Sequence, residues 1–89
     1  MFMVTDKENE KPPITSREYQ VLKHMAEGTR NEHIAEKLYI APDTVRTHRR
    51  NVRRKLGIKD VSSRRILIYQ QEVERLRPFF ESGFSADMP

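Results

Sequence analysis

Glycines and prolines divide the apolar pattern of this chain into short blocks. The breaks fall at Gly28, Pro42, Gly57 and Pro78. Glycine supplies the left-handed residue that commonly follows a helix, whereas proline fits the first turn of a helix and disfavours a helical residue before it. Apolar residues recur at helical spacing within the blocks, and none alternates apolar and polar residues as a strand does. The pattern therefore predicts an all-α fold of four helices.

Local signals set the expected bounds of these helices. Thr15 and Glu18 form a capping box, in which the Thr15 side chain accepts from the Glu18 amide and Glu18 reaches back. Pro42 suits the first position of the third helix, where an amide hydrogen would have no partner. The expected ranges are 16–27 for the first helix, Thr29 or Asn31 to Leu38 or Tyr39 for the second, 42–56 for the third, and Ser62 or Ser63 to the residue before Pro78 for the fourth.

The chain has 89 residues, which limits it to one small domain. Residues 1–13 are charged and end in two prolines, so we expect a flexible, disordered N-terminal arm. The helical domain is expected to occupy residues 14–77, and residues 78–89 to form a short irregular tail. A domain of this size is only marginally stable alone, which favours self-association.

Positive charge is concentrated in one part of the chain. Between Thr44 and Arg65 there are nine basic residues and one acidic residue, although the net charge of the whole chain is only +4. A solvated surface usually mixes charges of both signs, whereas a clustered basic face is typical of proteins that bind nucleic acid. The charge pattern therefore favours a polyanionic partner.

The composition disfavours several classes of protein. Without cysteine the chain offers no disulfide scaffold and no cysteine-based zinc site. His24, His33 and His48 lack a metal-binding spacing, so we expect no metal and no cofactor. A chain this short has little room for a catalytic pocket, and we expect no enzymatic activity. No segment has the length of a signal-peptide core or a membrane span, which predicts a soluble, intracellular protein without a membrane partner.

Two short helices joined by a few residues, of which the second is basic on its outer face, indicate a helix-turn-helix. Further landmarks are Thr15, Arg17 and Glu18, Val21-Leu22, Gly28, Asn31, Ile34-Ala35, Thr44-Val45, His48 and Lys55-Leu56-Gly57. With these landmarks, residues 14–59 resemble the LuxR-type (GerE-like) DNA-binding domain of bacterial transcription regulators. The resemblance implies a four-helix domain whose third helix, about 42–56, lies in the major groove of double-stranded DNA. It also implies a sequence-specific regulator in the bacterial cytoplasm, at the nucleoid.

The resemblance implies that Arg46, Thr47 and Arg50 reach the bases, and a helical wheel places the same residues on the face away from the core. Arginine can form paired hydrogen bonds to guanine O6 and N7, and the threonine methyl suits the methyl of thymine. Other polar residues around this face are expected to contact phosphates, which set position and affinity. The phosphate candidates are Asn31, Thr44, Arg49, Arg53, Arg54 and Lys55.

The chain departs from the family pattern at both ends of its basic region. Ala41 is a poor cap where the family usually has serine, so Asp43 or Thr44 must compensate. Arg64 and Arg65 stand where the family tends to have small or apolar residues. This second departure leaves the register of the fourth helix open by about one or two residues.

The fourth helix has more apolar surface than one buried face needs, because Ile66, Leu67 and Ile68 are consecutive. The helix could simply close the core, or one face could close the core while another pairs with a second copy. The family often dimerises through this helix, so we favour a homodimer and expect Ile66 or Leu67 to face the core. The dimerisation candidates are Ile66, Tyr69, Val73 and Leu76.

A second function remains open on the same residues. A protein-docking module that resembles the fourth region of sigma factors would share the opening pattern and bind the transcription machinery, which makes RNA polymerase a candidate partner. His48 and the Lys55-Leu56-Gly57 run favour the LuxR type. The basic outer face favours a DNA partner for the LuxR-type domain and for the sigma-like module alike. We therefore favour a DNA-binding regulator.

Overall fold

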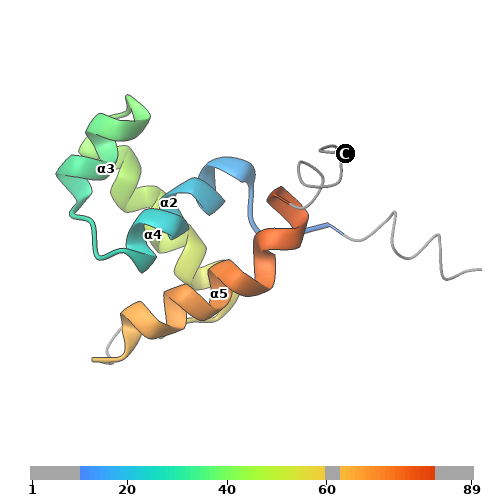
Figure 1. Cartoon of the computed structure of the whole chain (residues 1–89). Coiled ribbons are helices and arrows are strands. Elements are labelled where there is room, and N and C mark those ends of the chain that lie inside the picture. The colour runs from blue at the N-terminus through green and yellow to red at the C-terminus, as the bar shows by residue number, and fades with distance from the viewer. Residues whose placement is uncertain (1–10, 60–62, 82–89) are drawn as a thin grey trace, which may run out of the picture.

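The computed structural model describes residues 11–59 and 63–81, in which four α-helices follow one another (Figure 1). They are α2 Ser16–Ala26, α3 Asn31–Leu38, α4 Pro42–Leu56 and α5 Arg65–Phe80. No strand occurs among the described residues, and the predicted all-α, four-helix fold is confirmed. None of these helices is long and apolar enough to cross a bilayer. The predicted arm, apart from residues 11–13, and the predicted tail from residue 82 onward lie outside the described residues.

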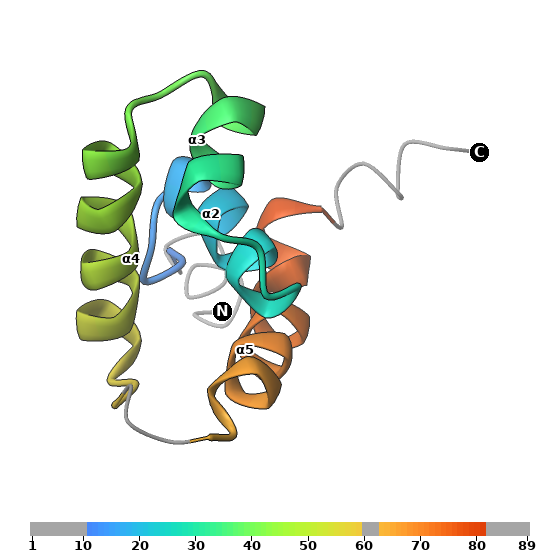
Figure 2. The same cartoon turned by 90° about the vertical axis from the view of Figure 1, so that its left-hand side faces the viewer.

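The central helix is α2. It packs against both α4 and α5, while α3 packs against α4. Figure 2 shows α4 and α5 on either side of α2, with α3 beside the first turns of α4. The pair α3 and α4 therefore has the order and the contact of a helix-turn-helix, and α2 joins α4 to the rest of the domain.

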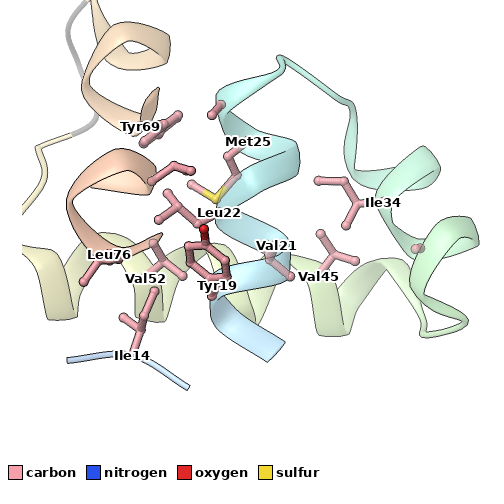
Figure 3. Close-up of a cluster of buried hydrophobic side chains, with 13 residues drawn as sticks. Ile14, Tyr19, Val21, Leu22, Met25, Ile34, Val45, Val52, Tyr69 and Leu76 are labelled. Atoms are coloured by element: carbon pink, nitrogen blue, oxygen red, sulfur yellow. The ribbon is translucent and has the colours of Figure 1, made fainter. Parts of the chain in front are cut away.

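The core lies where α2 meets α4 and α5 and where α3 meets α4 (Figure 3). Val21 and Leu22 of α2 are completely buried, and Met25 is 1% exposed. Each large apolar side chain buried in this way contributes about 1.5–3 kcal/mol relative to an exposed position. The other helices add Ile34, Ala35, Val45, Val52, Tyr69, Val73 and Leu76 to the same cluster.

The predicted capping box is present at the start of α2. The Thr15 amide donates to Oε1 of Glu18 at 2.9 Å, and the Glu18 amide donates to Oγ1 of Thr15 at 3.1 Å. Beyond the other end, Gly28 has the expected left-handed conformation, with φ +77°. A local signal at each end therefore places α2 within one residue of its expected range.

The starts of α3 and α4 both lack a capping side chain. Arg30 precedes α3 and makes no side-chain hydrogen bond to its first turn. Ala41 precedes α4 and likewise offers no side-chain bond, although Asp43 in the first turn places a negative charge near the positive end of the helix dipole. Between the two helices, Tyr39 ends α3 in a left-handed conformation. The predicted range of 42–56 for the third helix is confirmed.

The observed α5 differs from the predicted fourth helix at both ends. It begins at Arg65 rather than at Ser62 or Ser63, and it continues past Pro78 to Phe80. A proline inside a helix removes one amide donor and crowds the carbonyl one turn earlier. Tertiary contacts must therefore stabilise this last turn.

Those contacts come from α2. The ring of Phe80 stacks on that of Tyr19, with centroids 4.4 Å apart. The Tyr19 hydroxyl donates to Glu81 at 2.7 Å, and the Lys23 ammonium lies 3.1 Å from the same carboxylate oxygen. Burial and the hydrogen bond to Glu81 raise the pKa of Tyr19 to about 12, so its hydroxyl remains a donor across the physiological range.

The buried face of α5 is not the expected one. Tyr69, Val73 and Leu76 are 1%, 6% and 0% exposed and belong to the core against α2, whereas Leu67 is 49% exposed. Ile66, the remaining dimerisation candidate, is half-buried. The assignment of Tyr69, Val73 and Leu76 to a dimer contact is therefore wrong. The packing of α5 on α2 within one chain has already used that face. Of the two alternatives for a core-facing residue, Leu67 is exposed and only Ile66 is partly buried.

Candidate nucleic-acid interface

Two buried valines set the rotation of α4. Val45 and Val52 are completely buried. The opposite side of the helix therefore faces away from the core, and Arg46, Thr47 and Arg50 are all exposed there. The structure leaves the three predicted base-contact residues accessible from outside.

A cavity of about 400 Å³ lies beside this outer side of α4. Four arginines at i, i+3, i+4 and i+7 of α4 line it, together with one residue of α3 and two of α5. Among the described residues its lining contains no acidic side chain, and concentrated charge of one sign in a concave surface attracts counter-ions. We call it the arginine cavity, and its lining residues are Asn31, Arg46, Arg49, Arg50, Arg53, Arg65 and Tyr69.

The arginine cavity brings together Asn31 of α3 with four of the predicted DNA-contact arginines of α4. Asn31 is half-buried, at the first position of its helix. Thr44 and Arg54 are exposed but do not belong to the lining. Nη2 of Arg54 donates to Oδ1 of Asn51 at 3.2 Å. The phosphate candidates thus fall into a clustered group and a separate exposed group.

Asp43 contacts two of the three base-contact candidates. Its carboxylate forms an ion pair with Arg46, and its backbone carbonyl accepts a hydrogen bond from the Thr47 hydroxyl at 3.2 Å. The ion pair is exposed, since 57% of the Arg46 side chain is accessible. Exposed ion pairs contribute little, about 0–1 kcal/mol, so Arg46 can exchange Asp43 for a DNA group at small cost.

Lys55 has a different partner from the predicted phosphate. Its Nζ lies 3.0 and 3.1 Å from the two carboxylate oxygens of Glu18. Burial opposes ionisation of Glu18, but the hydrogen bond from the Thr15 amide and the ion pair with Lys55 together outweigh it and hold its pKa below the ordinary value. Lys55 therefore joins the end of α4 to the start of α2, and a DNA phosphate would have to compete with Glu18 for it.

Arg65 and Tyr69 line the arginine cavity but were not predicted to contact DNA. Arg65 is the first residue of α5. In Figure 1 this end of α5 lies below the segment between α2 and α3, and residues of both line a neighbouring cavity of about 320 Å³. The sequence feature that could have indicated a role for Arg65 was the pair Arg64 and Arg65. Two positive charges at the start of a helix oppose its dipole, which is an unusual placement for arginine.

The sequence of this chain is similar to those of bacterial regulatory proteins. Residues 12–67 match a family described as bacterial regulatory proteins, luxR family. The chain is 48% identical over 48 residues to an uncharacterized transcriptional regulatory protein of Bacillus subtilis, YxjL. It is 36% identical over 67 residues to a nitrate/nitrite response regulator protein homolog of Haemophilus influenzae. It is 44% identical over 55 residues to the transcriptional regulatory protein LnrK of Bacillus subtilis.

These alignments cover 54%, 75% and 62% of the chain, but only 22%, 32% and 25% of the respective relatives. The chain therefore spans a third or less of the length of these curated relatives. No solved structure matches the chain. The family match includes all of α2, α3 and α4 and the first residues of α5, which are the elements around the arginine cavity.

Proposed function

This chain belongs to the luxR family of bacterial regulatory proteins, and from this premise we propose that it regulates transcription by binding specific sequences in double-stranded DNA. In this proposal α4 enters the major groove and presents Arg46, Thr47 and Arg50 to the bases. The two arginines are suited to guanine and the threonine methyl to thymine. A DNA partner would place its action in the bacterial cytoplasm, at the nucleoid.

The observation that carries this proposal is the division of α4 into two sides. Val45 and Val52 occupy the buried side, whereas the accessible side presents arginines to a cavity in which no described lining residue is acidic. Positive side chains that neutralise DNA phosphates release bound counter-ions, which supplies much of the affinity. In the proposal Arg49 and Arg53 neutralise phosphates, Asn31 donates an uncharged hydrogen bond to one, and the exposed Thr44 and Arg54 extend these contacts.

We also propose that two copies bind DNA together. One inserted helix contacts only a few base pairs, and a two-fold pair of helices reads two half-sites about one helical turn apart. Because the apolar stripe on the inner side of α5 is buried, the contact between copies would use the outer side of α5. Leu67, 49% exposed, is the most accessible aliphatic residue there.

Binding to selected DNA at several salt concentrations tests the proposed function. Duplexes that bind the protein would first be selected from a random pool, and fluorescence anisotropy would then compare a selected duplex with a scrambled one. We expect tighter binding to the selected duplex. If about four to six phosphates are neutralised, the logarithm of affinity should fall with that of salt concentration with a slope of about −4 to −5.

Two results would contradict the proposal. Equal affinity for selected and scrambled duplexes would leave no sequence specificity to explain. A flat salt dependence, or no DNA binding at all, would instead favour the alternative of a protein-docking module that binds the transcription machinery, with RNA polymerase as the first partner to test.

A further inference from the structure

Arginine occupies the start of α5, where a helix disfavours it. Arg65 is the first helical residue, and the first turn contains no acidic residue. The amide end of a helix carries a partial positive charge, so guanidinium groups placed there are electrostatically unfavourable unless an anion lies nearby. This arrangement is the first indication of an anion.

The start of α3 adjoins the same space. Neither α3 nor α5 has a side-chain hydrogen bond from its cap residue to its first turn. First-turn amides that no cap satisfies are natural donors to a phosphate or carboxylate. Asn31 and Arg65, the first residues of these two helices, both line the arginine cavity and the neighbouring cavity.

A side chain of α4 and a buried hydroxyl complete the lining. Arg49 of α4 and Tyr69 of α5 also line both cavities. Tyr69 is 1% exposed, and its hydroxyl has no hydrogen-bond partner among the described residues. A buried hydroxyl without a partner is unfavourable, and a phosphate oxygen would accept its hydrogen. Tyr69 therefore indicates a ligand independently of the charges.

We propose that the two adjoining cavities form one binding site for a phosphate group. Arg49 and Arg65 supply the charge, the first turns of α3 and α5 supply amide donors, and the Tyr69 hydroxyl supplies one further donor. The phosphate can belong to the DNA backbone or be free in solution. In the first case the inference rests on the proposed function and adds α5 to the DNA interface, and in the second case it is independent of it.

The first arm of the test compares Arg65→Gln with Arg75→Gln. Both changes remove one positive charge from α5, but Arg75 pairs with Glu72 on the surface and lines neither cavity. If the phosphate belongs to DNA, Arg65→Gln should make the slope of log affinity against log salt shallower by about 0.9, equally on selected and scrambled duplexes. Arg75→Gln should leave the slope unchanged.

Tyr69→Phe tests the hydroxyl separately, since it removes one oxygen and keeps the buried ring. In the DNA case we expect about a threefold to tenfold loss of affinity with an unchanged salt slope, because a neutral donor is lost. The melting temperature of each variant would be measured alongside. Arg65→Gln should not lower it, because the change removes a charge that opposes the helix dipole.

The second arm measures thermal unfolding without DNA, in sodium phosphate and in sodium chloride of equal ionic strength. If free phosphate is a ligand, phosphate should raise the melting temperature of the wild type and of Arg75→Gln above the chloride value, and should not do so for Arg65→Gln. A preference for phosphate that depends on Arg65 would therefore support the site without any DNA.

The two proposals can fail separately. If wild-type protein binds selected DNA but Arg65→Gln and Arg75→Gln behave alike in both arms, the phosphate site is wrong and the proposed function stands. If the wild type binds no DNA but shows the Arg65-dependent effect of phosphate, the site stands and the proposed function is wrong.

Discussion

Among single residues, Tyr39 combines an unusual backbone with an exposed side chain. It has φ 60° and ψ 45°, and it is the only residue other than glycine with a positive φ in the described part of the chain. The left-handed conformation costs a residue with a Cβ atom about 1–2 kcal/mol. The Tyr39 side chain is 94% exposed, so burial within the chain does not offset this cost.

We therefore expect Tyr39→Gly to raise the free energy of unfolding by about 0.5–1 kcal/mol, since the greater freedom of glycine in the unfolded chain cancels part of the gain. Tyr39→Ala is the matched control, because it removes the ring but keeps the Cβ atom. Urea unfolding followed by circular dichroism would measure both. An equal change in the two variants would show that the ring, and not the backbone, is responsible.

Two arginines of α4 have different proposed roles, because Arg50 is expected to contact bases and Arg54 to contact phosphates. Arg50 lines the arginine cavity and would face the major groove of the DNA in the proposal, whereas Arg54 is exposed one turn later and donates a hydrogen bond to Asn51. Arg50→Ala should weaken binding to a selected duplex by about 1–3 kcal/mol and relax the preference at one or two base positions. Arg54→Ala should weaken selected and scrambled duplexes alike.

Anisotropy titrations with a panel of singly substituted duplexes would separate the two roles. If both variants lose the same affinity on every duplex, Arg50 does not read bases and the assignment of this face of α4 must change.

At the scale of helices, one partly buried ion pair fixes α4 relative to α2. Glu18 is 4% exposed and accepts from both the Thr15 amide and the Lys55 ammonium. Its carboxylate thus caps one helix and holds the end of another. Because α4 carries the proposed recognition residues, the pair connects the stability of the domain to the orientation of its DNA-binding side.

This pair should make stability depend on pH. A carboxyl group whose pKa is lower in the folded chain stabilises the fold above its ordinary pKa, and this contribution is lost as the pH falls through the folded-state pKa. The pKa of Glu18 is lowered from an ordinary 4.5, so we expect stability to decrease as the pH drops below that value. Glu18→Gln should cost about 1–3 kcal/mol at neutral pH and reduce the loss on acidification.

Chemical denaturation between neutral and acidic pH would measure this effect. Glu74→Gln is the control, because Glu74 pairs with Arg77 on the surface and its side chain is 70% exposed. Its effect should stay within about 1 kcal/mol. If the two variants have the same stability at every pH, the Glu18–Lys55 pair does not stabilise the domain.

For the whole molecule, the two sides of α5 lead to opposite predictions. Leu67→Glu adds a charge to an exposed position and should weaken the proposed dimer and binding to a palindromic duplex, while the melting temperature changes little. Leu76→Glu adds a charge to a completely buried position and should unfold the domain. Sedimentation with and without DNA, together with thermal unfolding, would measure both.

The proposed dimer can be contradicted by a separate experimental outcome. A wild-type protein that remains monomeric with and without DNA, and binds a single half-site as tightly as a palindrome, would contradict it. Such a result would leave base recognition by α4 untouched, because that proposal needs only one copy.

Most helix bounds were predictable because the interactions that set them are local. The capping box joins Thr15 to Glu18, and the left-handed glycines Gly28 and Gly57 follow the ends of α2 and α4. Pro42 likewise fits the first position of α4. In each case the interacting groups lie within a few residues of one another, so a short window of sequence contains all of them. The outer position of Arg46 and Arg50 followed from the same helical period.

The remaining features depend on surfaces brought together from distant parts of the chain. Ile66, Leu67 and Ile68 are apolar on more than one side of α5, so their pattern allows several buried faces, and only packing on α2 leaves Leu67 exposed. The same packing extends α5 beyond Pro78 through the stacking of Phe80 on Tyr19. It also brings the start of α5 to the arginine cavity. Burial is a property of two surfaces in contact, and neither surface alone specifies its partner.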